Sequence, residues 1–203
     1  MTRALLRTLA LAAAAVALCG CISLLPKSKP AQLYRFGYTG PAAPAAALHR
    51  TVGVFRTNTR FAAEADDDRI LTMTGGKAAY IAQSRWVAPA TTLFDQAVAN
   101  AFDASGGPVR LISRGQQGKA DYALRLEVRD FETRYASPDA APTVVVRLYA
   151  ALSRADQTSV GEQIFESRAP AGDNRVGAIT DAYSKAVTDV VGQLVAWTNA
   201  NAK

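Results

Sequence analysis

The sequence has little of what metal binding or nucleophilic catalysis requires. It contains two cysteines, Cys19 and Cys21, and one histidine, His49. If Cys19 leaves with an N-terminal signal, only Cys21 remains, so an internal disulfide, structural zinc and iron–sulfur centres are excluded. His49 adjoins a Pro-Ala segment and is expected to be exposed or at a strand edge, and no Gly-x-Ser-x-Gly motif of serine hydrolases occurs. The sequence therefore predicts no enzyme, no metal and no cofactor.

Blocks of basic residues are also missing, although the formal net charge is +6. That charge falls to about +4 once the two arginines of the predicted signal are removed. The remaining basic residues stand singly and form no stripe of the kind that neutralises phosphates. They include Arg50, Arg56, Arg60, Arg110, Arg125, Arg147 and Arg168. Nucleic acid is therefore not an expected partner.

The N-terminus has the composition of an export signal. Arg3 and Arg7 precede an apolar run over 8–18, which is far shorter than the roughly 20 apolar residues that span a bilayer. Leu18-Cys19-Gly20-Cys21 is similar to a bacterial lipobox, in which the chain is cut before the cysteine and its sulfur receives a diacylglyceryl group with fatty acids such as palmitate. We therefore predict a signal peptide over 1–20 and lipidation at Cys21. The alternative is an ordinary signal peptide with two incidental cysteines.

Residues 21–32 are predicted to form a lipidated tether, because two prolines and two lysines in so short a stretch fit neither helix nor strand periodicity. No second long apolar run follows Cys21. We expect the rest of the chain, residues 33–203, to form a single domain held at a membrane by lipid.

Periodicity predicts the elements of this domain. Strands are expected at 33–36, 51–55, 69–74, 77–82, 109–112, 120–128, 143–153 and 160–167, and helices at 89–104 and 175–199. Gly75-Gly76 is typical of a two-residue hairpin turn. The alternation that starts at Ala120 slips at Arg129-Asp130, which predicts a bulge. Asp173 or Asn174 is expected to cap the last helix.

The last three strands are joined by short turns, which favours an antiparallel meander. The long helices are amphipathic and need a sheet face to cover. The predicted fold class is therefore α+β, a mainly antiparallel sheet with two long amphipathic helices packed on one face.

Two further segments have alternative interpretations. Asp66-Asp67-Asp68 could offer carboxylates to a divalent cation, but a solvated acidic turn is favoured because the rest of a calcium loop is missing. Glu64 and Asp66 are not favoured as a glycosidase pair, since nothing marks a sugar cleft. Trp86, between a hairpin and a helix, is favoured as a core residue over an interface anchor.

A series of motifs in a fixed order resembles one protein family. The motifs are a lipobox at Cys21, a Tyr-x-Phe strand at Leu33–Phe36, an Arg69-Ile70 strand, a partner strand with Tyr80, the junction Arg85-Trp86-Val87-Ala88-Pro89, a strand from Tyr122 to Phe131 and a final amphipathic helix. This order is similar to the ABC-type transport auxiliary lipoprotein family, which includes the paraquat-inducible protein C lipoproteins. The sharpest of these motifs is Arg-Trp-x-x-Pro.

The resemblance implies a periplasmic, lipid-anchored and non-enzymatic component of a lipid transport system. Its expected partners are a mammalian-cell-entry (MCE) domain lipid carrier and an ABC permease with its ATPase, and a homo-oligomer is a further possibility. Arg85 and Trp86 are candidate partner-binding residues. Ile22 stands where an aspartate would retain such a lipoprotein in the inner membrane, so the expected location is the periplasmic face of the outer membrane. The rival hypothesis is a regulatory lipoprotein of envelope assembly, such as a peptidoglycan synthase activator or a factor for secretion or pilus assembly.

Overall fold

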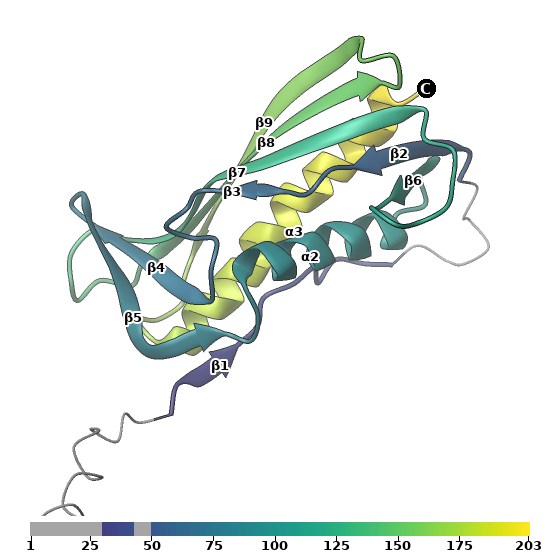
Figure 1. The fold of residues 1–203 in the computed structure, drawn as a ribbon. Coiled ribbons are helices and arrows are strands. Elements are labelled where there is room, and N and C mark those ends of the chain that lie inside the picture. The colour runs from purple at the N-terminus through teal and green to yellow at the C-terminus, as the bar shows by residue number, and fades with distance from the viewer. Residues whose placement is uncertain (1–29, 43–49) are drawn as a thin grey trace, which may run out of the picture. The chain divides into compact units, whose positions relative to one another are not determined.

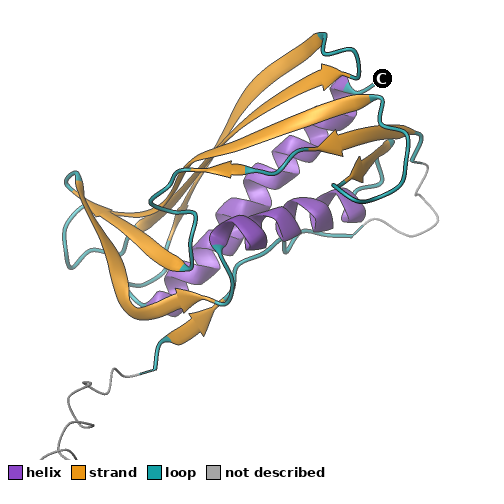
Figure 2. Cartoon of the chain, in the orientation of Figure 1, coloured by secondary structure: helices purple, strands orange, loops and turns teal. Residues whose placement is uncertain are grey.

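The computed structural model describes residues 30–42 and 50–203, and Figures 1 and 2 show its elements. The strands are β1 (Gln32–Tyr34), β2 (Val52–Arg56), β3 (Arg60–Phe61), β4 (Arg69–Thr74), β5 (Lys77–Trp86), β6 (Val109–Ile112), β7 (Tyr122–Tyr135), β8 (Thr143–Arg154) and β9 (Ser159–Pro170), and the helices are α2 (Ala90–Ala104) and α3 (Val176–Asn201). The predicted signal peptide, Cys21, Ile22 and His49 lie outside the described residues. Residues Ala31–Lys203 form one compact unit.

The sheet is organised around β7. Along one edge, β7 pairs with β8 in antiparallel register, and β8 pairs with β9 in the same way. Along the other edge, β7 pairs in succession with β2, β3 and β4, which all run parallel to it. Beyond these strands, β6 extends the sheet from β2, while β5 and β1 extend it from β4. On this side of β7 the sheet therefore divides into two arms (Figure 1). One arm consists of β2 and β6, and the other of β4, β5 and β1.

The prediction of a mainly antiparallel sheet is wrong, because the sheet is mixed. The hairpin β4–β5 and the meander β7–β8–β9 are antiparallel, as their short connections require. The pairs β1–β5, β2–β6, β2–β7, β3–β7 and β4–β7 are parallel. Alternation along a strand shows which face is buried, but it does not show which distant strand lies alongside or in which direction. The two-residue strand β3 was not predicted either.

The local turn predictions are confirmed. Gly75 and Gly76 form the β4–β5 turn with φ angles of 53° and 80°, in the left-handed region that glycine adopts without steric cost. The register of β7 with β8 shifts between Val128 and Asp130, at the predicted bulge. Because the bulge adds one residue, Val128 and Phe131 both point into the core although they are three positions apart. Both halves of β7 therefore bury apolar side chains on the same face of the sheet.

A second irregularity bends β5. Its pairing with β4 jumps from Leu71–Tyr80 to Arg69–Arg85, which leaves additional residues on β5. Within this segment Gln83 has a φ of 54°, which is uncommon for a residue other than glycine. After the bend, Ser84 to Trp86 pair with β1 (Figure 1). The irregularity therefore aligns the end of β5 with β1 and brings Trp86 to the core.

The two helices cover the same face of the sheet (Figure 1). α3 packs against β8, β9 and α2, and α2 also packs against β6. α3 buries a stripe that includes Ile179, Tyr183, Val190 and Leu194, at the spacing that places side chains on one helical face. Neither of the described helices is long and apolar enough to span a bilayer.

The prediction of a side-chain cap for α3 is wrong. The N-cap residue is Arg175, and no side chain accepts a capping hydrogen bond there. The Asn174 carboxamide instead accepts from the hydroxyl of Tyr135 (2.9 Å) and donates to the carbonyl of Pro138 (3.4 Å). Asn174 therefore connects the start of α3 to the end of β7 rather than to the helix backbone.

An aromatic cluster lies between the sheet and α3. Trp86 contacts Phe36 and Tyr183 at centroid distances of 4.9 and 5.0 Å, and Phe131 contacts Tyr183 at 4.8 Å. The hydroxyl of Tyr183 is fully buried and accepts a hydrogen bond from Thr133 (3.2 Å). Burial raises the pKa of Tyr183, because the phenolate would lose its hydration. This cluster therefore joins Phe36, near the N-terminal end of the domain, to Tyr183 on the C-terminal helix.

Candidate functional site

The Arg85-Trp86 junction leads from β5 into α2 and is held by the backbone of the acidic turn. The Trp86 N–H donates to the carbonyl of Asp68 (2.7 Å), and the Ala90 N–H donates to the carbonyl of Asp67 (2.9 Å). Since α2 has no side-chain cap, this second bond satisfies one of the free N–H groups of its first turn. The acidic turn therefore fixes where β5 ends and α2 begins.

The carboxylates of this turn bind arginines. Asp67 pairs with Arg69 (2.6 Å) and Asp68 with Arg85 (2.6 Å), and all four side chains are at least one third exposed. Such solvated pairs contribute little to stability, because water screens their attraction. The bond from Asp67 raises the pKa of Arg69, so this guanidinium stays charged. Across residues 30–42 and 50–203, no group of three or more His, Cys, Asp or Glu side chains is placed to hold a metal ion.

Trp86 and Arg85 point to opposite sides of the junction. Trp86 is 2% exposed and lies in the aromatic cluster, which is the core position that the sequence favours. Arg85 is exposed and pairs in register with Leu33 of β1. Leu33 and Val87 are 62% and 51% exposed, which is uncommon for large apolar side chains in this domain. Arg85 therefore belongs to a surface with both apolar and charged groups.

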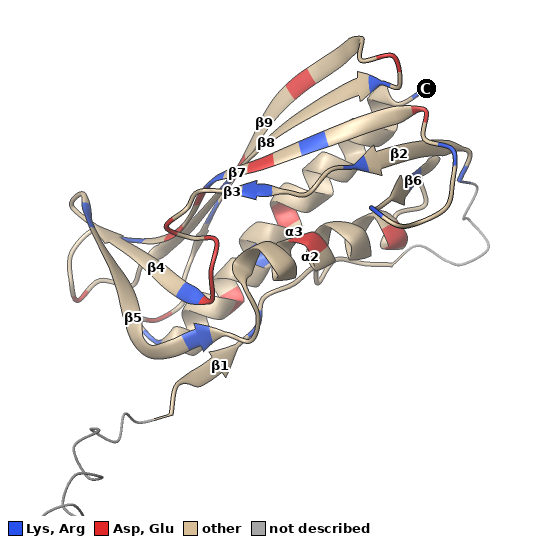
Figure 3. Ribbon diagram, in the orientation of Figure 1, with Lys and Arg blue, Asp and Glu red and all other residues tan. Residues whose placement is uncertain are grey.

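Four arginines that stand apart in the sequence line one hollow of about 350 Å³, here called the arginine pocket. Arg56 ends β2, Arg60 begins β3, Arg125 lies on β7, and Arg114 lies in the loop after β6. Phe55, Thr57 and Asn58 complete the lining. Figure 3 shows the basic segments of β2, β3 and β7 close together where these strands adjoin.

The inner wall of the arginine pocket is fixed to α2. Arg56 is paired with Asp95, which also accepts a hydrogen bond from the hydroxyl of Thr59 (2.6 Å). The Arg56 side chain is only 10% exposed, and its Nε has no hydrogen-bond partner among the described residues. Asp95 therefore neutralises this arginine but leaves one buried donor unused.

The other three arginines of the pocket have no acidic partner within the described ranges. Arg125 donates to the neutral hydroxyl of Tyr149 (3.3 Å). Glu127 lies opposite Arg60 in the sheet register but accepts from Arg129 on its own strand (3.1 Å). The charges of Arg60, Arg114 and Arg125 are therefore not compensated by ion pairs in the described structure.

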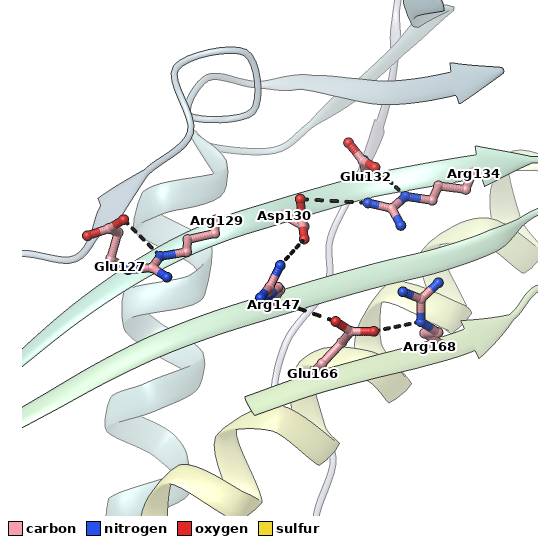
Figure 4. A network of polar contacts seen from close by, with 8 residues as sticks. All are labelled: Glu127, Arg129, Asp130, Glu132, Arg134, Arg147, Glu166 and Arg168. Carbon is pink, nitrogen blue, oxygen red and sulfur yellow. Dashed lines mark hydrogen bonds and ion pairs between the residues drawn. The ribbon is translucent and has the colours of Figure 1, made fainter. Parts of the chain in front are cut away.

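A second group of charges, on β7–β8–β9, is balanced. Figure 4 shows a network of four acidic and four basic side chains on these strands. Its members are Glu127, Arg129, Asp130, Glu132, Arg134, Arg147, Glu166 and Arg168. Each arginine of this network has at least one carboxylate within ion-pair distance, so the network needs no external anion.

Another hollow, of about 510 Å³, contains charges of both signs. Lys119 pairs with Asp121 (3.1 Å), and this contact, followed by the Gly53 N–H, lowers the pKa of Asp121. Asp156 and Arg154 line the same hollow. Lys203 completes its basic side chains, so this hollow, unlike the arginine pocket, has acidic side chains among its lining.

The sequence reasoning missed the arginine pocket. Arg56, Arg60 and Arg125 do stand singly along the chain, as described above, but the sheet brings them together. These arginines come together because β2 and β3 each pair in parallel with β7, and that pairing was not predicted. No spacing within a single segment indicates that arrangement.

Comparison with known proteins identifies the family. The family model described as ABC-type transport auxiliary lipoprotein component matches residues 39–195. The chain belongs to this family. Its members are auxiliary lipoprotein components of ABC-type transport, which agrees with the resemblance found in the motifs. No curated protein matches the chain.

Solved structures show the same fold. Protein XCC0632 from Xanthomonas campestris, of the family DUF330, is 27% identical with a TM-score of 0.73, and the match covers 84% of this chain and 96% of that one. An uncharacterized protein is 10% identical with a TM-score of 0.64, covering 83% and 99% of the two chains. The hypothetical protein CT253 from Chlamydia trachomatis is 8% identical with a TM-score of 0.50, covering 74% and 99%. The latter two similarities concern the fold alone.

Proposed function

We propose that this ABC-transport auxiliary lipoprotein is a non-enzymatic component of an MCE-type lipid transport system, anchored to the periplasmic face of the outer membrane. The observation that supports this most directly is the family match over residues 39–195. The proposed partners are an MCE-domain lipid carrier and the ABC permease with its ATPase. Anchoring would come from diacylglyceryl on Cys21, followed by the tether over 21–32.

Partner binding is proposed for the exposed side of the Arg85-Trp86 junction. Arg85 offers a guanidinium next to two exposed apolar side chains, Leu33 and Val87. Interfaces are enriched in arginine and in apolar side chains at their centre. Trp86 is buried, so its part in binding would be to hold Arg85 in position from the core.

Affinity purification from membranes tests this proposal. The tagged full-length protein, solubilised in an uncharged detergent, should retain an MCE-domain protein and the permease. Val87→Asp places a carboxylate on the proposed surface and should reduce that recovery, whereas Lys77→Gln at the distant start of β5 should not. Recovery of a peptidoglycan synthase or a secretion or pilus assembly protein instead of the transporter would favour the regulatory alternative.

Separation of the two membranes on a density gradient tests the location. Because Ile22 cannot make the contacts of a retention aspartate, the protein should travel with outer-membrane porins, and Ile22→Asp should move it toward inner-membrane fractions. Wild-type protein in the inner membrane would contradict the outer-membrane placement while leaving the transport proposal to the purification experiment.

A further inference from the structure

We infer that the arginine pocket binds a phosphate group, carried by a phospholipid headgroup or present as free phosphate. This inference rests on the pocket itself and does not depend on the partners or the membrane proposed above. Its lining consists of Arg56, Arg60, Arg114 and Arg125 with Phe55, Thr57 and Asn58.

The charge of the pocket is the first reason. Three of its lining arginines have no acidic partner in the described residues, whereas Arg129, Arg134, Arg147 and Arg168 of the network on β7–β8–β9 are all paired. Like charges that converge in one hollow repel each other, so the arrangement costs free energy unless an anion is bound. A bound anion would compensate Arg60, Arg114 and Arg125 together.

The donor groups are the second reason. A guanidinium presents a planar set of N–H donors that matches phosphate oxygens in bidentate geometry. Asn58 adds an amide group to the lining. Several donors from different directions suit a tetrahedral anion better than a flat carboxylate, which is satisfied by one guanidinium.

The size and lining of the pocket define which part of a ligand it takes. A volume of about 350 Å³ is at the lower end of the range for small-molecule sites. Phe55 is the one apolar side chain among the lining residues, so the apolar surface of the pocket is limited to this ring and to the hydrocarbon parts of the polar side chains. A phospholipid would therefore place its phosphate in the pocket and keep its acyl chains outside.

The backbone holds these arginines in place. Arg114 precedes Gly115, which has a φ of 84°, and the turn is closed by the Gln116 N–H, which donates to the carbonyl of Ser113 (3.1 Å). Arg60 and Arg125 both lie on paired strands. The positions of their backbones are therefore set before any ligand arrives, which reduces the entropy cost of binding.

Calorimetric titration of the full-length lipidated protein in an uncharged detergent tests the inference. The probes are inorganic phosphate, short-chain phosphatidylglycerol and acetate. Phosphate or phosphatidylglycerol should bind, and acetate should bind at least about tenfold more weakly, because it satisfies only one guanidinium. Tighter binding of phosphatidylglycerol than of phosphate would identify a headgroup site, and equal or tighter binding of phosphate would identify free phosphate as the ligand.

Variants connect the binding to the pocket. Arg60→Gln with Arg114→Gln should weaken binding of the phosphate probes by about tenfold or more, since two charge-assisted contacts are lost. The control, Lys77→Gln with Arg168→Gln, removes the same charge elsewhere and should leave the affinity unchanged. If the glutamine variant does not fold, Arg60→Lys with Arg114→Lys keeps the charge, loses the bidentate geometry and should still bind more weakly than wild type. Absent binding of both phosphate probes, equal binding of acetate, or equal losses in pocket and control variants would overturn the inference.

Discussion

Trp86 and Tyr183 pack edge to face, with ring centroids 5.0 Å apart and an interplanar angle of 83°. Trp86 reaches this contact from the end of β5, after the bend at Gln83, and Tyr183 from the N-terminal third of α3. Both side chains are almost completely buried. This pair therefore connects the β4–β5–β1 arm of the sheet to the C-terminal helix.

Trp86→Ala should destabilise the domain severely. Removal of a buried tryptophan costs about 3–5 kcal/mol in the free energy of unfolding, because a cavity remains where the ring contacted Phe36 and Tyr183. Urea unfolding measures the loss. Trp197→Ala is the control, since Trp197 is only partly buried against Phe165 and should cost less. Unchanged unfolding together with lost partner binding would make Trp86 an interface anchor.

Tyr183 should make the domain sensitive to alkaline pH. Burial raises its pKa above the ordinary value of 10.0, so above that pH the unfolded chain loses a proton that the folded state keeps. The stabilisation is complete below pH 10 and is lost as the pH rises from there toward the folded-state pKa. Urea unfolding at increasing pH should therefore show a decline in stability that is shallower in Tyr183→Phe. Equal slopes in both proteins would contradict this assignment.

At neutral pH the same substitution tests the buried hydrogen bond. Tyr183→Phe leaves the Thr133 hydroxyl, which is fully buried, without its partner and should cost about 1–3 kcal/mol. Adding Thr133→Val removes the unsatisfied hydroxyl and should recover part of that loss. Strictly additive effects in this double-mutant cycle would show that the two hydroxyls are not coupled.

Gly53→Ala should weaken the pairing of β2 with the start of β7. A Cβ atom at Gly53 would overlap the carbonyl oxygen of Lys119, which is backbone and cannot move away independently. The cost should be about 1–3 kcal/mol, typical of overpacking, measured by thermal or urea unfolding. Gly192→Ala on α3 is the control, because nothing lies within 4 Å of its new Cβ and alanine favours helix. If both variants are equally stable, the close approach at Gly53 has no energetic importance.

Cys21→Ala should release the protein from the membrane. Stable anchoring needs more than one acyl chain, and each buried CH₂ group contributes about 0.8 kcal/mol. Without the thiol, the protein should appear in the soluble fraction or accumulate as an uncut precursor, as shown by fractionation and mass spectrometry. A variant that stays in the membrane pellet after a carbonate wash would contradict lipidation at Cys21.

Local patterns predicted most of the elements of this domain. The two-residue alternation from Tyr122, the slip near Asp130 and the glycine pair Gly75-Gly76 all depend on neighbours in the chain, and they mark β7, its bulge and the hairpin turn. The cap of α3 was predicted wrongly because the N-cap residue is Arg175, and Asn174 accepts instead from a tertiary partner, the hydroxyl of Tyr135. A local rule fails where a distant partner competes for the same side chain.

By itself the sequence determined the order of the elements, the buried side of each long strand and helix, and the motifs that point to the family. These follow from side-chain polarity and from the fixed periods of helix and strand. Only the tertiary structure decided the direction of pairing along β7, and with it the meeting of Arg60, Arg114 and Arg125 in one pocket. Parallel pairing depends on contacts between segments far apart in the chain. Such contacts produce no periodic pattern of polar and apolar residues in either segment.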